Sequence, residues 1–189
     1  LTAFGNTVPT SFLRLVPHQE APTSICWGDR NRSVLVRVPL GWQHIDDSMF
    51  RDANPNESPI TGLPNDSQTV ELRSPDGSAA IHLLLAGIVV AARLGLTQPG
   101  MADYARERKV DGDASQTPGL DQLPSSCFEA AGRLLAQRED YEAYGVFPAG
   151  LIDSWASRLV ELGDMHLRDD LADSRVSVEE LVDRYFHVG

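Results

Sequence analysis

The residues of this sequence that are best suited to chemistry are carboxylates and arginines at close spacing. In Thr69–Arg73, polar and apolar residues alternate, which is the period of a half-buried strand. Side chains two positions apart share one face of a strand, so Glu71 and Arg73 are predicted to stand side by side, with Val70 and Leu72 on the other face. An isolated Glu-x-Arg pair would most simply be a solvated strand face or an internal ion pair.

A second group makes a functional site the stronger interpretation. Arg14, Glu20, Arg32 and Arg37 lie close together in the sequence, between apolar residues. Guanidinium groups bind carboxylate and phosphate in a fixed, bidentate geometry. Several arginines near a carboxylate are therefore what a site needs when it handles a carboxylate and a phosphate beside a divalent metal.

Composition limits the kinds of partner. The chain has 189 residues, 42% of them hydrophobic and 23% charged, which fits one ordinary globular domain and excludes wholesale disorder. The net charge of -11 disfavours nucleic acid and anionic lipid, and the arginine-rich start is suited to a small anion. The apolar run Ile81–Leu96 contains Arg93 and is short for a membrane span, and no secretory signal is visible, so we expect a cytoplasmic protein.

The first part of the chain is predicted to be rich in strands. Two of them, Thr23–Trp27 and Ser33–Val38, are rich in β-branched and aromatic residues and flank the turn-like Gly28–Asn31. The segment Gly41–Gln68 holds several Pro and Asn residues and is predicted to be a long surface excursion. After Thr69–Arg73, a turn should lead into the most apolar helix, near residues 78–96.

The second part is predicted to be mostly helical. A polar loop is expected over Thr97–Pro124, where the acidic start at Asp111 lacks the glycine and glutamate of a calcium loop. Ser126 with Glu129, and Ser177 with Glu180, have the spacing of capping boxes, and a further helix should begin near Pro148. Strands followed by helices indicate an α+β fold rather than a βαβ winding. The two cysteines, Cys26 and Cys127, are predicted to be reduced and buried.

Several blocks of this sequence resemble the glutamine synthetase catalytic domain. They are Ser11-Phe12-Leu13-Arg14-Leu15-Val16-Pro17, Glu20-Ala21-Pro22, Arg30-Asn31-Arg32-Ser33, Arg37-Val38-Pro39 and Val70-Glu71-Leu72-Arg73-Ser74-Pro75-Asp76. The resemblance implies the C-terminal part of that domain, strand-rich over 1–77 and helical over 78–189. Its antiparallel strands would belong to a fold shared with guanidino kinases. The N-terminal β-grasp domain and the upstream half of the active site would lie outside these residues.

The resemblance also implies roles for individual residues at the glutamate end of the site. Arg14 and Arg73 match arginines that bind the carboxylates of glutamate. Glu20 matches a flap glutamate that closes over the substrate and helps to deprotonate ammonium, so it is expected to be catalytic.

At the phosphate end, Arg32 and Arg37 match arginines that contact the nucleotide phosphates, and Arg32 is expected to be catalytic as well. Glu71 matches a ligand of Mg²⁺ or Mn²⁺. The sequence departs from the family pattern at Thr10, where asparagine is frequent, at Asp66 and Thr69, where basic residues are usual, and at Ala80-Ile81-His82, where Asn-Pro-Tyr is usual.

The implied activity is ATP-dependent ligation of ammonia, or of another amine, to the side-chain carboxylate of glutamate within a ring-shaped homo-oligomer. Two alternatives remain open. One is a guanidino kinase-like phosphotransferase, and the other is a non-catalytic regulatory or assembly homologue, which the departures from the family pattern would allow.

Overall fold

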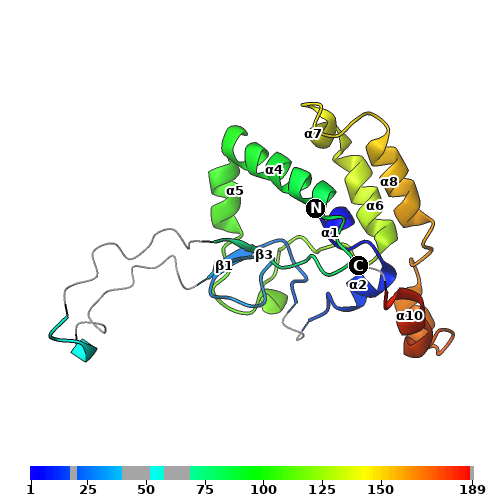
Figure 1. The fold of residues 1–189 in the computed structure, drawn as a ribbon, viewed down its shortest axis with the longest axis horizontal. Helices are drawn as coiled ribbons and strands as arrows, with labels where there is room; N and C mark the ends of the chain where they lie inside the picture. The colour runs from blue at the N-terminus through cyan, green and yellow to red at the C-terminus, as the bar shows by residue number, and fades with distance from the viewer. Residues whose placement is uncertain (18–20, 40–51, 58–68, 188–189) are drawn as a thin grey trace.

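The structure is a computed structural model that describes residues 1–17, 21–39, 52–57 and 69–187. A small sheet is formed by β1 (Trp27–Asp29), β2 (Val36–Val38) and β3 (Glu71–Leu72). The helices are α1 (Thr2–Gly5), α2 (Pro9–Leu13), α4 (Ile81–Thr97), α5 (Met101–Glu107), α6 (Cys127–Ala136), α7 (Arg138–Glu142), α8 (Leu151–Val160), α9 (Leu167–Ala172) and α10 (Val178–Tyr185), with a short 3₁₀ helix at Ala114–Gln116. The predicted α+β class is confirmed (Figure 1).

The sheet has the order β1-β2-β3. The β2–β3 pair is antiparallel, as predicted, and places Arg37 opposite Glu71. The β1–β2 pair is parallel, with Trp27 opposite Val36 and Asp29 opposite Val38. The prediction of antiparallel strands is therefore wrong for this pair.

The predicted turn Gly28–Asn31 is also wrong, because Gly28 and Asp29 belong to β1. Arg30 adopts a left-handed conformation (φ 55°), and the Asn31 side-chain amide donates to the carbonyls of Val110 at 3.1 Å and Gly112 at 2.6 Å. These contacts hold the connection against residues 110–112, and the chain enters β2 parallel to β1 and does not form a hairpin. Residues 23–25 pair instead with 121–123.

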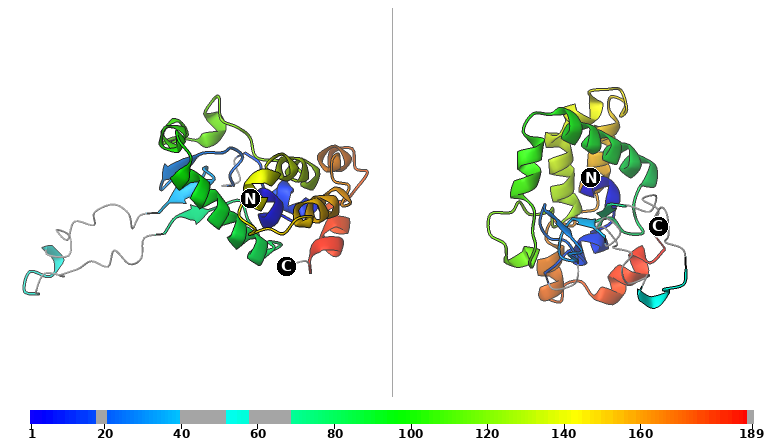
Figure 2. Two further views of the ribbon diagram at one scale, coloured as in Figure 1. Left: turned by 90° about the horizontal axis from the view of Figure 1, so that it is seen from above. Right: turned by 90° about the vertical axis from the view of Figure 1, so that its left-hand side faces the viewer.

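The core lies between the helices and is centred on Phe4, which is fully buried. Its ring stacks on Phe147 (centroids 5.4 Å apart) and meets the ring of Tyr141 edge-on at 5.6 Å. Helices α6 and α8 pack side by side next to α1, and in Figure 2 the strands lie beside this helical group. Trp155 on α8 donates its indole N–H to the carbonyl of Ala3 at 2.8 Å, which ties the start of the chain to the C-terminal helices.

Most of the predicted helices are confirmed. The capping box at Ser177 and Glu180 is complete. Ser126 accepts from the Glu129 amide as expected, but the Glu129 carboxylate binds the amide of Ser125. The polar loop predicted over Thr97–Pro124 is wrong in part, because it contains α5 and the 3₁₀ helix. No residue of α5 is buried, so the sequence carried no apolar periodicity to reveal it.

Helix α4 is apolar on two faces. Leu84, Gly87 and Val90 are buried toward the core, whereas Leu85, Val89 and others at helical spacing form an exposed apolar stripe, 56% and 63% exposed. Within the described residues no single helix is long and apolar enough to cross a membrane, and the pair α4–α5 meets the length and composition requirement only jointly, with a 105° bend between the two helices. The excursion predicted over Gly41–Gln68 lies largely outside the described residues.

Candidate functional site

An acid flanked by two arginines forms the centre of the candidate site. Because Arg37 and Glu71 are opposite each other in the β2–β3 register, their side chains meet, and Arg37 Nε lies 2.5 Å from Glu71 Oε2. Arg73, the residue that follows β3, lies two positions after Glu71, with its Nε 3.8 Å from the same oxygen. The prediction that Glu71 and Arg73 stand side by side is confirmed. The Glu71 side chain remains 43% exposed, although the oxygen that faces the two arginines, Oε2, is buried.

Arg73 connects this pair to the segment that carries Arg32. One terminal nitrogen of the Arg73 guanidinium donates to the backbone carbonyl of Arg32, and the Arg73 side chain is only 14% exposed. The amide of Arg73 in turn donates to the carbonyl of Leu35 at 2.9 Å. These contacts fix the distance between β3 and the loop before β2, which is the loop that presents Arg32.

Arg14 contacts the two residues that follow Arg73 in the chain. Its guanidinium donates to the carbonyls of Ser74 and Pro75, the second at 3.3 Å. Asn6, which is fully buried, also donates to the Ser74 carbonyl, at 2.7 Å. Neither Asn6 nor Ser74 could be identified as a site residue from the sequence, because a buried backbone carbonyl with two donors leaves no mark in residue type or spacing.

A hollow of about 440 Å³ lies beside Arg32. It is lined by residues of both charges and by small polar residues, among them Asp29, Arg30, Asn31, Ser33, Asp111 and Asp113. Lys109 Nζ lies 3.2 Å from the Asp29 carboxylate, whose hydrogen bond and charge raise the pKa of Lys109. Pro17 and Ala21 also line the hollow. Glu20 itself lies outside the described residues.

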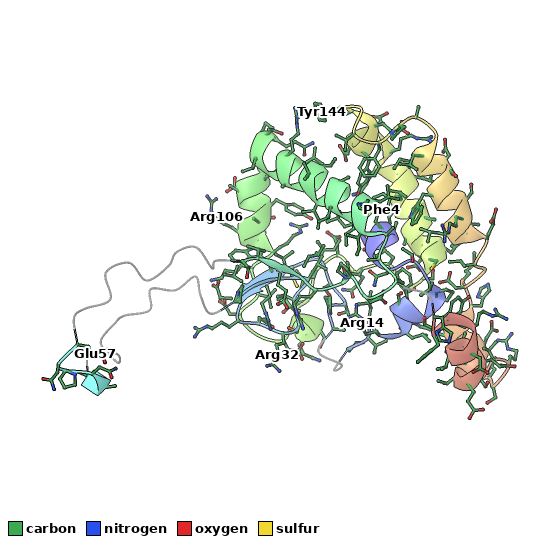
Figure 3. The ribbon with its side chains drawn as sticks, viewed as in Figure 1. Phe4, Arg14, Arg32, Glu57, Arg106 and Tyr144 are labelled. Atoms are coloured by element: carbon green, nitrogen blue, oxygen red, sulfur yellow. The ribbon has the colours of Figure 1, made fainter. Side chains whose placement is uncertain are left out.

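The structure therefore gathers five of the six predicted site residues around residues 71–75. Arg37 and Arg73 touch Glu71, Arg73 contacts the backbone of Arg32, and Arg14 contacts Ser74 and Pro75. In Figure 3 the labelled Arg14 and Arg32 both lie along the lower edge of the molecule, well away from Tyr144. Two of these cations, Arg37 and Arg73, lie beside the Glu71 carboxylate, and guanidinium groups so placed can neutralise an anionic ligand.

These residues do not form a complete metal site by themselves. No group of three or more His, Cys, Asp or Glu side chains suited to a metal ion occurs among the described residues. Glu71 is a lone carboxylate that two arginines already contact, whereas Mg²⁺ and similar cations take about six oxygen ligands. The described part of the chain therefore supplies no complete set of metal ligands.

Comparison with known proteins agrees with this arrangement. The sequence model described as "Glutamine synthetase, catalytic domain" matches residues 1–159. The chain is 32% identical to the glutamine synthetase of Thermococcus kodakarensis over 100% of its own length and 38% of that protein, and 31% identical to the glutamine synthetase of Pyrococcus abyssi over 100% and 39%. It is 30% identical to the glutamine synthetase of Mycobacterium bovis over 83% and 29%.

The segment that carries these residues thus belongs to a catalytic domain of the glutamine synthetase type. The chain is a member of the glutamine synthetase family. It spans less than two fifths of the length of these curated relatives.

Proposed function

We propose that this chain is part of an enzyme that uses ATP to join ammonia, or another amine, to the side-chain carboxylate of glutamate. The observation that carries the proposal is that Arg14, Arg37 and Arg73 contact the segment that begins at Glu71, while Arg73 also binds the backbone carbonyl of Arg32. Phosphoryl transfer depends on positioning and on charge neutralisation, and both are what this arrangement offers.

In the proposed reaction, a side-chain carboxylate oxygen of glutamate attacks the γ-phosphorus of ATP and ADP leaves. The amine then attacks the carbonyl carbon of the acyl phosphate, and inorganic phosphate leaves with the former carboxylate oxygen. Arg32 and Arg37 would neutralise the phosphate oxygens, and Arg14 and Arg73 would hold the carboxylates of glutamate. Glu20 would cover the substrate and accept the proton of ammonium.

Mg²⁺ or Mn²⁺ would supply further charge neutralisation for the phosphates when bound. Glu71 is our candidate for one of its ligands, because it is a half-exposed carboxylate at the centre of the arginine cluster. The described residues hold no group of three side chains suited to such an ion, so further ligands would be needed to complete the site.

The exposed face of α4 supports the view that more polypeptide covers this chain in the working enzyme. A helix that is apolar all round is normally buried on all sides, and the stripe on α4 includes Ile81 and Leu96, which are 62% and 87% exposed. We therefore propose that the active enzyme is the full-length protein, assembled as a homo-oligomeric ring in the cytoplasm, and that this chain alone is inactive.

A coupled ATP-turnover assay of the full-length protein tests the proposal. Phosphate release should require both glutamate and an amine, with a panel of amines used to identify the acceptor. Phosphate release that persists without glutamate, or transfer to a guanidino acceptor such as creatine, would contradict it.

A further inference from the structure

Arg168, at the start of α9, is a residue whose side chain contacts a distant part of the chain. This residue lies beyond residues 1–159, which the family model matches, and its neighbours Asp169 and Asp170 suggest an ordinary solvated helix end. Its side chain nevertheless turns inward, toward α2, and the C-terminal helices lie against α2 in Figure 1.

Arg168 binds backbone and not carboxylate. Its Nη2 donates to the carbonyl of Phe12 at 2.9 Å and to that of Leu15 at 3.3 Å. Within the part of the chain that the structure describes, no ion pair joins it to an acid. The Phe12 carbonyl belongs to the last turn of α2 and the Leu15 carbonyl follows it, so Arg168 places a cation at the C-terminal end of this helix.

The two carbonyls stand on either side of Arg14. Arg14 is the C-cap of α2, and the flanking Phe12 and Leu15 are 1% and 5% exposed. Because Arg168 binds the backbone before and after Arg14, it fixes the position and direction of the Arg14 side chain. The Arg14 side chain can then reach the Ser74 and Pro75 carbonyls next to β3.

The start of α9, which carries Arg168, is held in place by hydrogen bonds to the helical core. The amide of Leu167 donates to the carbonyl of Asp164 at 3.1 Å. The buried carboxylate of Asp164 accepts from the amides of Cys127 at 2.6 Å and Phe128 at 3.1 Å, at the start of α6. The start of α9 is thus fixed to the helical core. Through its hydrogen bonds to Phe12 and Leu15, Arg168 holds the end of α2 at a fixed position relative to that core.

We infer that Arg168 is a positioning residue for Arg14 and, resting on the proposed function, for the binding of glutamate. It acts through the α2 terminus and touches neither substrate. Replacing Arg168 should therefore raise the KM for glutamate more than the KM for ATP.

The test uses the full-length enzyme with Arg168→Gln, Arg168→Lys and the control Arg184→Gln, an exposed arginine on α10. Arg168→Gln should raise the KM for glutamate about fivefold, since two charge-assisted hydrogen bonds are lost, while the KM for ATP changes by less than about twofold. Arg168→Lys should fall between Arg168→Gln and wild type, because it keeps the charge but not the planar guanidinium that places Nη2 between the two carbonyls. Arg184→Gln should behave as wild type.

Hydrogen exchange gives a readout that does not need activity. In Arg168→Gln, peptides covering residues 9–17 should exchange faster than in wild type, and those covering α8 should not. Unchanged exchange over residues 9–17, or a KM for glutamate equal to wild type, would overturn the inference, as would equal changes for glutamate and ATP. A wild-type enzyme with no glutamate-dependent turnover would instead refute the proposed function, and the exchange comparison would still decide the role of Arg168.

Discussion

Arg37 and Glu71 face each other across the antiparallel pair β2–β3, with Arg37 Nε 2.5 Å from Glu71 Oε2. The acid at the centre of the candidate site is thus held by a cross-strand partner. Arg73 approaches the same oxygen from the neighbouring position on the same face. This arrangement fixes the Glu71 carboxylate between two cations and leaves nearly half of its side chain exposed.

Glu71→Gln should lower metal affinity and turnover without unfolding the protein. The amide keeps the shape of the side chain but loses the charge that a hard cation and two arginines share. The Mg²⁺ and Mn²⁺ dependence of ATP turnover in the full-length enzyme measures the effect, with circular dichroism as the check on folding. Glu161→Gln, at an exposed position after α8, is the matched control. If Glu71→Gln leaves the metal dependence of turnover unchanged, Glu71 is no metal ligand.

Arg14→Lys and Arg73→Lys should each weaken glutamate binding roughly tenfold. Lysine keeps the positive charge but cannot make two parallel hydrogen bonds, and a lost charge-assisted contact costs about 1.5–3 kcal/mol. Steady-state kinetics with glutamate as the varied substrate measures the change. A wild-type KM for glutamate in both variants would show that these arginines serve the structure alone, through their contacts with the carbonyls of Ser74 and Arg32.

Residue types and spacing predicted the helices with apolar stripes, the capping box at Ser177 and the common face of Glu71 and Arg73. These features depend on periods of two or about 3.6 residues, which the sequence displays directly. The parallel pairing of β1 with β2 could not be predicted, because it depends on contacts of Asn31 with residues about 80 positions away. The contact between Asn6 and Ser74 also joins residues far apart in the sequence, so it could not be predicted either.

The two thiols should be unreactive in the folded chain. Cys26 and Cys127 are free and buried, and burial raises the pKa of both, with the nearby Asp164 carboxylate adding to the effect at Cys127. Since the thiolate is the reactive form, an aromatic disulfide reagent should label neither thiol near pH 8, and raising the pH from 7 to 8 should not accelerate labelling.

Unfolding in guanidinium should release two reactive thiols, and Ser157→Cys, at an exposed position on α8, should react at once in the folded chain. Rapid labelling of the folded wild-type chain would contradict the burial of Cys26 and Cys127. A count of zero thiols after unfolding without reductant would reveal a disulfide.

The isolated 189-residue chain should bind ATP·Mg weakly or not at all. It holds the arginines, but its described residues lack a set of metal ligands, so the phosphates would meet an incomplete site. Calorimetric titration with ATP·Mg measures this, and circular dichroism shows that the chain is folded. Micromolar affinity would mean that the segment is a self-sufficient nucleotide site, which would favour a guanidino kinase-like transferase.

If ATP activates the side-chain carboxylate of glutamate as an acyl phosphate, one oxygen of that carboxylate must leave with the phosphate. The full-length enzyme is given glutamate labelled with oxygen-18 in the side-chain carboxylate, together with ATP and the amine that supports turnover. The proposed reaction breaks the bond between the carbonyl carbon and the labelled oxygen. One phosphate carrying one oxygen-18 should therefore be released for each amide formed, as measured by mass spectrometry. Amide formation with unlabelled phosphate would contradict the account.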